Sequence, residues 1–83
     1  MADPAAVFAA ALVAERQASG IPTQAALARA AGIDLVEANR YERGKRIPTL
    51  VRFARLTCRA GIDPVPILAA LDGCDDRQPK DQT

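Results

Sequence analysis

Glycines and cap-plus-proline pairs interrupt this chain at intervals that each fit one short helix. The five glycines stand at positions 20, 32, 44, 61 and 73, and a glycine just past the last turn is a common end of a helix. Asp followed by Pro, at residues 3–4 and 63–64, is typical of a helix start, and Thr23, Asp34 and Thr49 are further N-cap candidates. These signals predict five helices: from residue 4 to Ser19, then over residues 24–31, 35 to about 42, 50–60 and 64 to about 71.

The composition requires a core of aliphatic side chains. Hydrophobic residues make up 49% of the chain but aromatic residues only 4%, and the abundant alanine has the highest helix propensity of all residues. We therefore expect an all-α fold, a compact five-helix domain over residues 1–73, followed by a disordered polar tail over residues 74–83. Helical spacing assigns these residues to the core: Phe8, Leu12, Leu27, Ala28, Ala31, Ala38, Tyr41, Leu50, Phe53, Ala54 and Leu56.

Residues for catalysis or metal binding are scarce. The chain has no histidine, no glycine-rich phosphate loop and two cysteines, Cys58 and Cys74, which are too far apart for a CxxC pair. We therefore expect no enzyme, no metal site and no cofactor. For the cysteines we expect a buried Cys58 and an exposed or frayed Cys74, with an intermolecular disulfide as the alternative.

The N-terminal apolar run resembles the core of a signal peptide but lacks its other parts. No basic residues precede it, and it ends in Glu15-Arg16 where a cleavage site would have small residues. No apolar run reaches the roughly 18–20 residues of a membrane span. These observations predict a cytoplasmic protein without a membrane partner.

The net charge of +1 conceals an uneven distribution along the chain. Residues 1–39 carry a net charge of −2 and residues 60–83 one of −3, whereas residues 40–59 carry seven cations against Glu42 alone, a net charge of +6. Such a block is expected of a protein that contacts phosphate. Three of its cations share one helix face, which an ordinary solvated surface also explains: Arg52, Arg55 and Arg59. Three others flank Gly44 and favour phosphate more strongly: Arg43, Lys45 and Arg46.

Two short helices joined by a turn at Gly32 predict a helix-turn-helix over residues 24–43. Ala28 provides the small side chain that is needed where the two helices cross. Ile33 fills the space beneath the turn. Other helical hairpins share these features, so the geometry alone does not establish a function.

Three stretches of this segment form a recurring pattern: residues 23–28 (TQAALA), Gly32-Ile33 and residues 40–48 (RYERGKRIP). They resemble the phage-repressor-like, Cro/XRE-type helix-turn-helix family of transcriptional regulators. The family pattern is S/T-Q-x-x-L-A, then G-V/I, then an aliphatic residue followed by E-x-G-K-x-x-P. The distance from Gly32 to Gly44 fits the pattern without a gap, and the resemblance extends from about residue 8 to about residue 71. One extra residue between Gly20 and Thr23 departs from the usual spacing.

The resemblance implies a lambda-repressor-like DNA-binding domain that places residues 35–42 in the major groove. The implied base-reading residues are Leu35, Val36, Asn39 and Arg40. The implied phosphate contacts are Gln24, aided by the N–H groups of its helix end, and Arg43, Lys45 and Arg46. The resemblance also implies a buried, structural ion pair between Arg16 and Glu42, which ties the first helix to the end of the third.

The chemistry of the implied reading face is mixed. Arg40 suits guanine and Asn39 suits adenine, whereas Leu35 and Val36 can only pack against thymine methyl groups. Glu37 can accept from cytosine, but close to phosphate we expect it to be repelled or turned aside. Many family members carry polar residues where Leu35 and Val36 stand. One hypothesis is therefore a DNA reader that relies partly on DNA shape, and the other is a helix-turn-helix that binds protein.

The segment from residue 62 to residue 71 has more aliphatic side chains than one covering helix needs. Because one module of this size offers a small interface with DNA, we expect a homodimer on a two-fold operator. The predicted dimer interface comprises Ile62, Pro64, Val65, Ile67, Leu68 and Leu71. Burial of all six within one chain is the alternative.

Our leading hypothesis is a Cro-like or controller-type regulator, a repressor or an activator or both, of the kind carried by mobile genetic elements. Its expected partner is a palindromic double-stranded DNA operator, with no small-molecule ligand, and it would associate with the nucleoid when bound. The alternative is a protein-binding helix-turn-helix module, such as an antiactivator or antitoxin-like adaptor.

Overall fold

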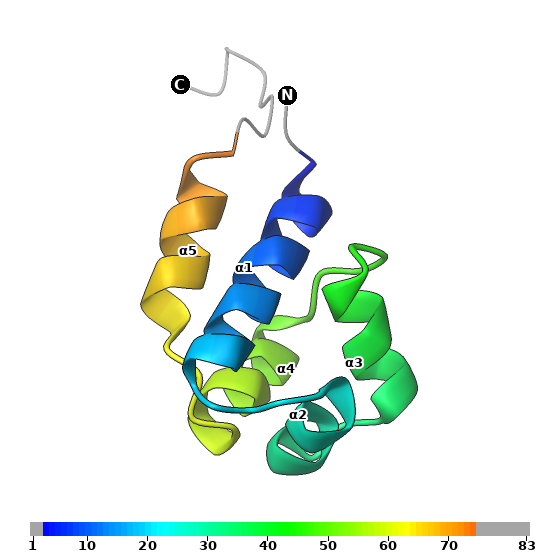
Figure 1. The fold of residues 1–83 in the computed structure, drawn as a ribbon. Coiled ribbons are helices and arrows are strands. Elements are labelled where there is room, and N and C mark those ends of the chain that lie inside the picture. The colour runs from blue at the N-terminus through cyan, green and yellow to red at the C-terminus, as the bar shows by residue number, and fades with distance from the viewer. Residues whose placement is uncertain (1–2, 75–83) are drawn as a thin grey trace.

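The computed structural model describes residues 3–74, which are helical with short connections and no strand (Figure 1). The elements are α1 (Pro4–Ala18), α2 (Gln24–Ala31), α3 (Leu35–Glu42), α4 (Leu50–Ala54), a π-helical segment η1 (Arg55–Arg59) and α5 (Pro64–Asp72). The all-α prediction is confirmed, and the helix starts lie where the sequence placed them. The predicted tail lies outside the described residues apart from Cys74.

Side-chain caps explain most of the helix starts. The Asp3 carboxylate accepts a hydrogen bond from the Ala5 N–H at 3.3 Å, and the Asp63 carboxylate accepts one from Val65 at 3.0 Å. The hydroxyls of Thr23 and Thr49 accept from the N–H three residues ahead, at 3.1 and 3.2 Å. Asp34 occupies the N-cap position of α3, but its side chain makes no capping hydrogen bond. These caps satisfy N–H groups that a helix start leaves without partners.

The core lies where α1 packs against α3 and α5 (Figure 1). The Phe8 ring meets Tyr41 edge-on, with centroids 6.3 Å apart and planes at 86°, and meets Phe53 at 6.1 Å and 63°. These geometries are favourable for aromatic pairs. Phe8 therefore connects α1 to both α3 and α4. The remaining fully buried large side chains are Leu12, Leu27, Leu56, Ile62 and Ile67.

The fourth predicted helix differs from expectation, because its second half is π-helical. The Thr57 hydroxyl donates to the carbonyl oxygens of Phe53 at 3.0 Å and Ala54 at 3.3 Å, and the N–H of Ile62 donates to the Thr57 carbonyl at 3.1 Å. A hydroxyl that binds the preceding turn competes with the regular helical bonds and widens the helix locally. The wide turn buries both Leu56 and Thr57.

Three residues of this region that the sequence assigned to the interior are exposed, so these three predictions are wrong. Leu50 is 82% exposed, and Ala54 is also exposed, because the buried stripe runs through Phe53, Leu56 and Ala60 and leaves both to one side. Cys58 is an exposed free thiol, since it follows the buried pair of the π turn and faces outward. Cys74 is half-buried, and its thiol contacts the Ala70 carbonyl at 3.7 Å.

None of the helices within residues 3–74 is long and apolar enough to cross a lipid bilayer.

The corrected core predicts unequal costs for two leucines of the same helical region. Leu56→Ala should lower the free energy of unfolding by about 2–5 kcal/mol, because it removes a fully buried side chain and leaves a cavity. Leu50→Ala should change it by no more than about 0.5 kcal/mol, since that side chain is already in water. Urea denaturation followed by circular dichroism measures both, and equal costs would contradict this assignment of the core.

Candidate nucleic-acid interface

The turn between α2 and α3 is built on Gly32. Its backbone adopts a left-handed conformation, φ 71°, and the Ile33 N–H beyond it donates to the Ala28 carbonyl at 3.0 Å. Only glycine adopts this conformation without strain. Leu27 and Ala28 are buried beneath the turn, and half-buried Ile33 packs against the same core. The turn therefore holds α3 at a fixed angle across α2 with the outer face of α3 exposed.

Arg16 and Glu42 form a nearly buried ion pair between α1 and the end of α3. Arg16 Nε donates to Glu42 Oε2 at 2.6 Å and Nη2 donates to Oε1 at 3.3 Å, with side-chain exposures of 9% and 3%. Arg16 Nη1 also donates to the Ile21 carbonyl at 3.1 Å. The pair predicted from the resemblance is thus present. The same guanidinium binds the corner between α1 and α2, where the sequence has its extra residue.

The hydrogen bonds continue from Glu42 to the reading helix. Gln24 Nε2 donates to Glu42 Oε1 at 3.2 Å, and Asn39 Nδ2 donates to Gln24 Oε1 at 3.0 Å. Both side chains are half-buried. Two residues that the sequence assigned separately, Gln24 to phosphate and Asn39 to a base, are thus bound to each other.

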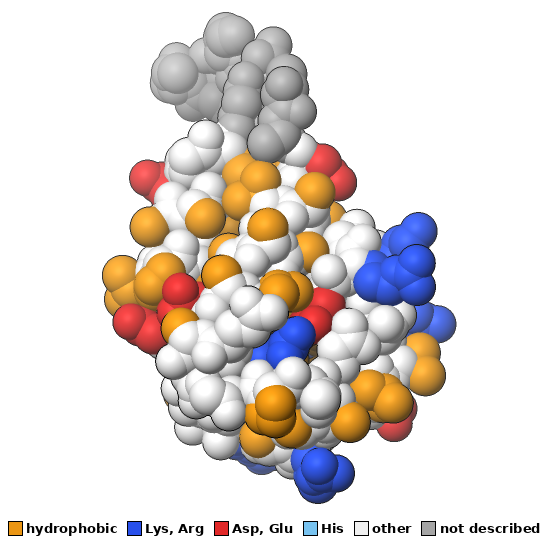
Figure 2. Space-filling model, in the orientation of Figure 1, with side chains coloured by type: hydrophobic (Ala, Val, Ile, Leu, Met, Phe, Trp, Pro, Cys, Tyr) orange, Lys and Arg blue, Asp and Glu red, His pale blue; other side chains and the backbone are white. Residues whose placement is uncertain are grey.

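The outer face of α3 presents mainly apolar groups and one cation. Leu35 and Val36 are 51% and 60% exposed, and Arg40 is exposed one turn further along. Ala38 and Tyr41 are buried on the opposite face, as helical spacing predicted. Leu35, Val36, Asn39 and Arg40 therefore lie on one side of α3. Figure 2 shows hydrophobic side chains and a group of Lys and Arg side chains together on the side of the molecule where α3 lies.

Glu37 is turned away from that face and neutralised. Its carboxylate accepts hydrogen bonds from the Tyr41 hydroxyl and from Arg52 of α4. Burial, together with the hydrogen bond and negative charge of Glu37, raises the pKa of Tyr41 to about 12, against the opposing charges of Arg52 and Arg46. This cluster was not predicted. The spacing of Glu37 and Tyr41, one helical turn apart, was a signal for their contact, but nothing local indicated Arg52.

Three exposed cations follow α3. Arg43 is the C-cap residue, Gly44 has φ 72°, and the Lys45 N–H donates to the Arg40 carbonyl at 2.9 Å, so the loop folds back on the helix end. Gly44 lies against the first turn of α1, where an added Cβ would be 3.4 Å from Ala6 Cα. Arg43, Lys45 and Arg46 are exposed.

The three cations that the sequence placed on one solvated helix face are not equally exposed. Arg52 and Arg55 are half-buried, whereas Arg59 is exposed. The predicted solvated face is therefore incomplete.

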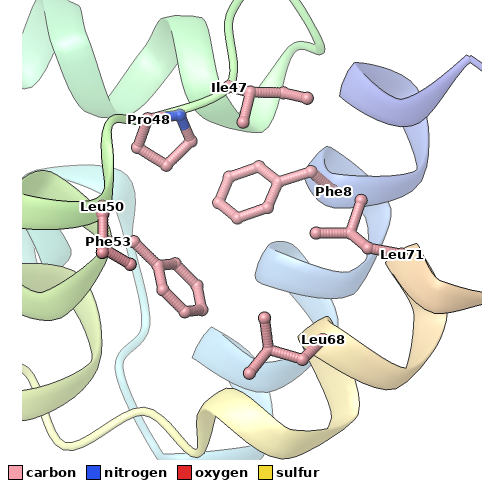
Figure 3. A pocket seen from close by; sticks show the side chains of 7 residues that line it. All are labelled: Phe8, Ile47, Pro48, Leu50, Phe53, Leu68 and Leu71. Atoms are coloured by element: carbon pink, nitrogen blue, oxygen red, sulfur yellow. The ribbon is translucent and has the colours of Figure 1, made fainter.

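The predicted dimer interface is only partly available on the surface. Ile62 and Ile67 are 2% and 0% exposed, so the assignment of these two to an interface is wrong: they complete the core of one chain. Val65 and Leu68 are exposed, and Pro64 and Leu71 are half-buried. Leu68 and Leu71 border an apolar hollow that is also lined by side chains of α1, α4 and the preceding loop (Figure 3).

Within residues 3–74, no group of three or more Cys, Asp or Glu side chains is placed to hold a metal ion.

Comparison with known proteins identifies the fold. A family model described as helix-turn-helix matches residues 14–67, which include α2, α3, α4, η1 and the loop that carries Arg43, Lys45 and Arg46. The chain belongs to the Cro/XRE-type helix-turn-helix family. Members of this family are DNA-binding regulators and generally not enzymes. No curated protein and no solved structure matches the chain. The family therefore establishes a DNA-binding regulator, and its finer properties must be argued from the residues of this helix-turn-helix.

The two ion pairs of this helix-turn-helix should differ in their effect on stability. Arg16→Met should lower the free energy of unfolding by roughly 3–5 kcal/mol, because it leaves the buried Glu42 carboxylate without its cation. Arg52→Met should cost less, about 1 kcal/mol, because side-chain exposures of 41% and 22% leave the Arg52–Glu37 pair partly in water. Methionine keeps much of the aliphatic stem in both variants. Chemical denaturation tests the difference, and equal losses would contradict it.

The raised pKa of Tyr41 predicts a loss of stability at alkaline pH. Below pH 10 the phenol is neutral in both states, so its contribution to stability is fully present. Between pH 10 and about 12 it ionises in the unfolded chain but not in the folded one, which removes roughly 2–3 kcal/mol. Tyr41 is the only tyrosine, so phenolate absorbance reports its titration directly. Tyr41→Phe should flatten the fall in stability, and a wild-type titration near pH 10 would refute the shift.

Proposed function

We propose that this chain is a sequence-specific transcriptional regulator that binds a palindromic double-stranded DNA operator as a homodimer, with α3 in the major groove. The single observation that carries the proposal is the exposed face of α3 beside the cations of the Gly44 loop. An α-helix fits the major groove, where base edges carry a distinct pattern of donors, acceptors and methyl groups. This arrangement lies on the scaffold of a DNA-binding family.

The reading chemistry follows from the side chains on that face. Arg40 is exposed, and the nearby Glu37 is paired with Arg52. The Arg40 guanidinium is therefore available for a bidentate contact with guanine O6 and N7. Leu35 and Val36 offer only apolar surface, which suits thymine methyl groups. We therefore expect the operator half-site to contain a guanine and adjoining thymines. Pairing of Glu37 with Arg52 supports this assignment, because it neutralises a carboxylate of α3 that would otherwise repel the DNA.

Phosphate contacts supply the sequence-independent part of the binding. Arg43, Lys45 and Arg46 project from one short loop at the end of α3, where they can contact the backbone that flanks the groove. Each phosphate neutralised contributes about −0.9 to the slope of log K against log salt concentration. Because the proposed partner is the DNA of the cell, we expect the protein in the cytoplasm.

The homodimer is proposed on the apolar surface at α5. Val65 is 65% exposed and Leu68 51% exposed, and Leu68 and Leu71 border the apolar hollow of Figure 3. Exposed aliphatic side chains of this kind are costly to leave in water. We propose that a second copy of the chain covers them. To read a two-fold operator, such a dimer must hold its two copies of α3 about one helical turn of DNA apart.

Selection of bound sequences from random DNA tests the proposal as a whole. We expect a palindrome whose half-sites are centred about one helical turn, or 10–10.5 base pairs, apart. Charge reversal of Lys45, Lys45→Glu, should weaken binding to every sequence and reduce the salt slope, because it removes a phosphate contact from each subunit. Leu35→Glu should abolish binding, because it puts a negative charge on the face of α3 that enters the groove.

Arg29→Glu is a matched control, since it makes the same charge reversal at an exposed cation of α2 that is not among the proposed DNA or dimer contacts. It should leave the selected sequence unchanged. If no sequence is selected, the proposed operator is refuted. If the selected sequence lacks two-fold symmetry, the proposed dimer is refuted. A cellular function that survives Lys45→Glu but not Leu35→Glu would instead support a protein partner at the apolar start of α3.

A further inference from the structure

Gln24 occupies a central position in the hydrogen-bonding chain of this domain. Its amide lies between the Glu42 carboxylate, 3.2 Å from Nε2, and the Asn39 amide, 3.0 Å from Oε1. Both ends of the side-chain amide are therefore engaged within the protein. The family resemblance alone implied a contact of Gln24 with a phosphate, for which the amide would point outward.

The chemistry of the chain fixes which way each amide is turned. Arg16 holds Glu42 as a carboxylate, and a carboxylate only accepts hydrogen bonds. Gln24 must therefore turn its NH₂ group to Glu42 and its carbonyl oxygen to Asn39. That oxygen only accepts, so Asn39 must turn its NH₂ group to Gln24. The charge of a buried ion pair thus determines the orientation of a side chain on the reading helix.

Asn39 keeps the groups that a base contact needs. Among the described residues its Oδ1 has no hydrogen-bond partner, and its second N–H is also available. Asn39 precedes Arg40 on α3 and is half-buried at the base of the exposed face. An asparagine with one oxygen and one N–H available recognises adenine through N6 and N7.

We propose that Gln24 is a positioning residue for Asn39, and that it sets the preference for adenine at one base pair of the operator instead of acting as a phosphate contact. The inference rests on the proposed function, because it needs α3 in the major groove. A preset side chain also loses less conformational freedom on binding. Without Gln24, the Asn39 amide is free to rotate and to present either its donor or its acceptor to a base.

Binding of Gln24→Ala to operators with each of the four base pairs at every position tests the proposal. Asn39→Ala identifies the pair that Asn39 reads. At this pair Gln24→Ala should lose most of the roughly 5- to 150-fold discrimination that a good bidentate contact provides. Preferences at the other pairs and the salt slope should be unchanged. The double variant should discriminate no worse than Asn39→Ala alone, because the two residues act as one unit.

A phosphate role makes the opposite prediction: weaker binding to every operator by a similar factor, with the preference at the pair that Asn39 reads unchanged. The salt slope stays the same in either case, because glutamine carries no charge. Either uniformly weaker binding or unchanged discrimination would overturn the proposal. Gln24→Met, which keeps the length of the side chain but not its amide, should behave like Gln24→Ala and guards against a variant that fails to fold. Gln17→Ala, at an exposed glutamine of α1, should leave all preferences intact. If the wild type selects no sequence, the proposed function fails and the inference with it; if only the effect of Gln24 is absent, the inference alone fails.

Discussion

The ion pair between Arg16 and Glu42 is the interaction on which the geometry of this domain depends. Removing two charges from water is costly, and their attraction compensates only when the remaining hydrogen-bonding groups are satisfied. Here they are: Arg16 also binds the Ile21 carbonyl, and Glu42 also accepts from Gln24. One pair therefore joins α1, the corner before α2, the start of α2 and the end of α3. A shift of any of these elements would leave a buried charge without its partner.

The two acidic residues of α3 are both neutralised by arginines from other helices. Glu42 is paired with Arg16 of α1, and Glu37 is paired with Arg52 of α4 and also accepts from Tyr41. As a consequence Arg40 is the charged side chain that α3 itself presents to solvent. Cations from α1 and α4 thus determine the electrostatic character of the outer face of α3. The sequence of α3 alone, with two acids and one base, does not reveal it.

Signals that act within a few residues were readable from the sequence, and those that depend on packing were not. The caps at Asp3, Thr23, Thr49 and Asp63 are local, so the helix starts followed directly. Which side of a helix faces inward depends on neighbours distant in the chain. Residue type therefore misled at Cys58, a type usually buried but here exposed, and at Leu50.

The same limit applies to the candidate site. The family pattern supplied the residues that we propose read bases and contact phosphate. The contact between Gln24 and Asn39 was not predicted, since it depends on the distance between the start of α2 and the middle of α3. Nor was the burial of Ile62 and Ile67, which depends on how α5 packs on α1.

The apolar start of α3 has a thermodynamic consequence. In the proposed complex Leu35 and Val36 leave water together, and burial of apolar surface lowers the heat capacity of the system. That part of the binding free energy does not depend on counterion release, unlike the part that comes from phosphate contacts. The complex would therefore have two separable sources of affinity, one weakened by salt and one that changes with temperature. A protein with this division retains part of its hold on DNA at ionic strengths that release proteins bound through charge alone.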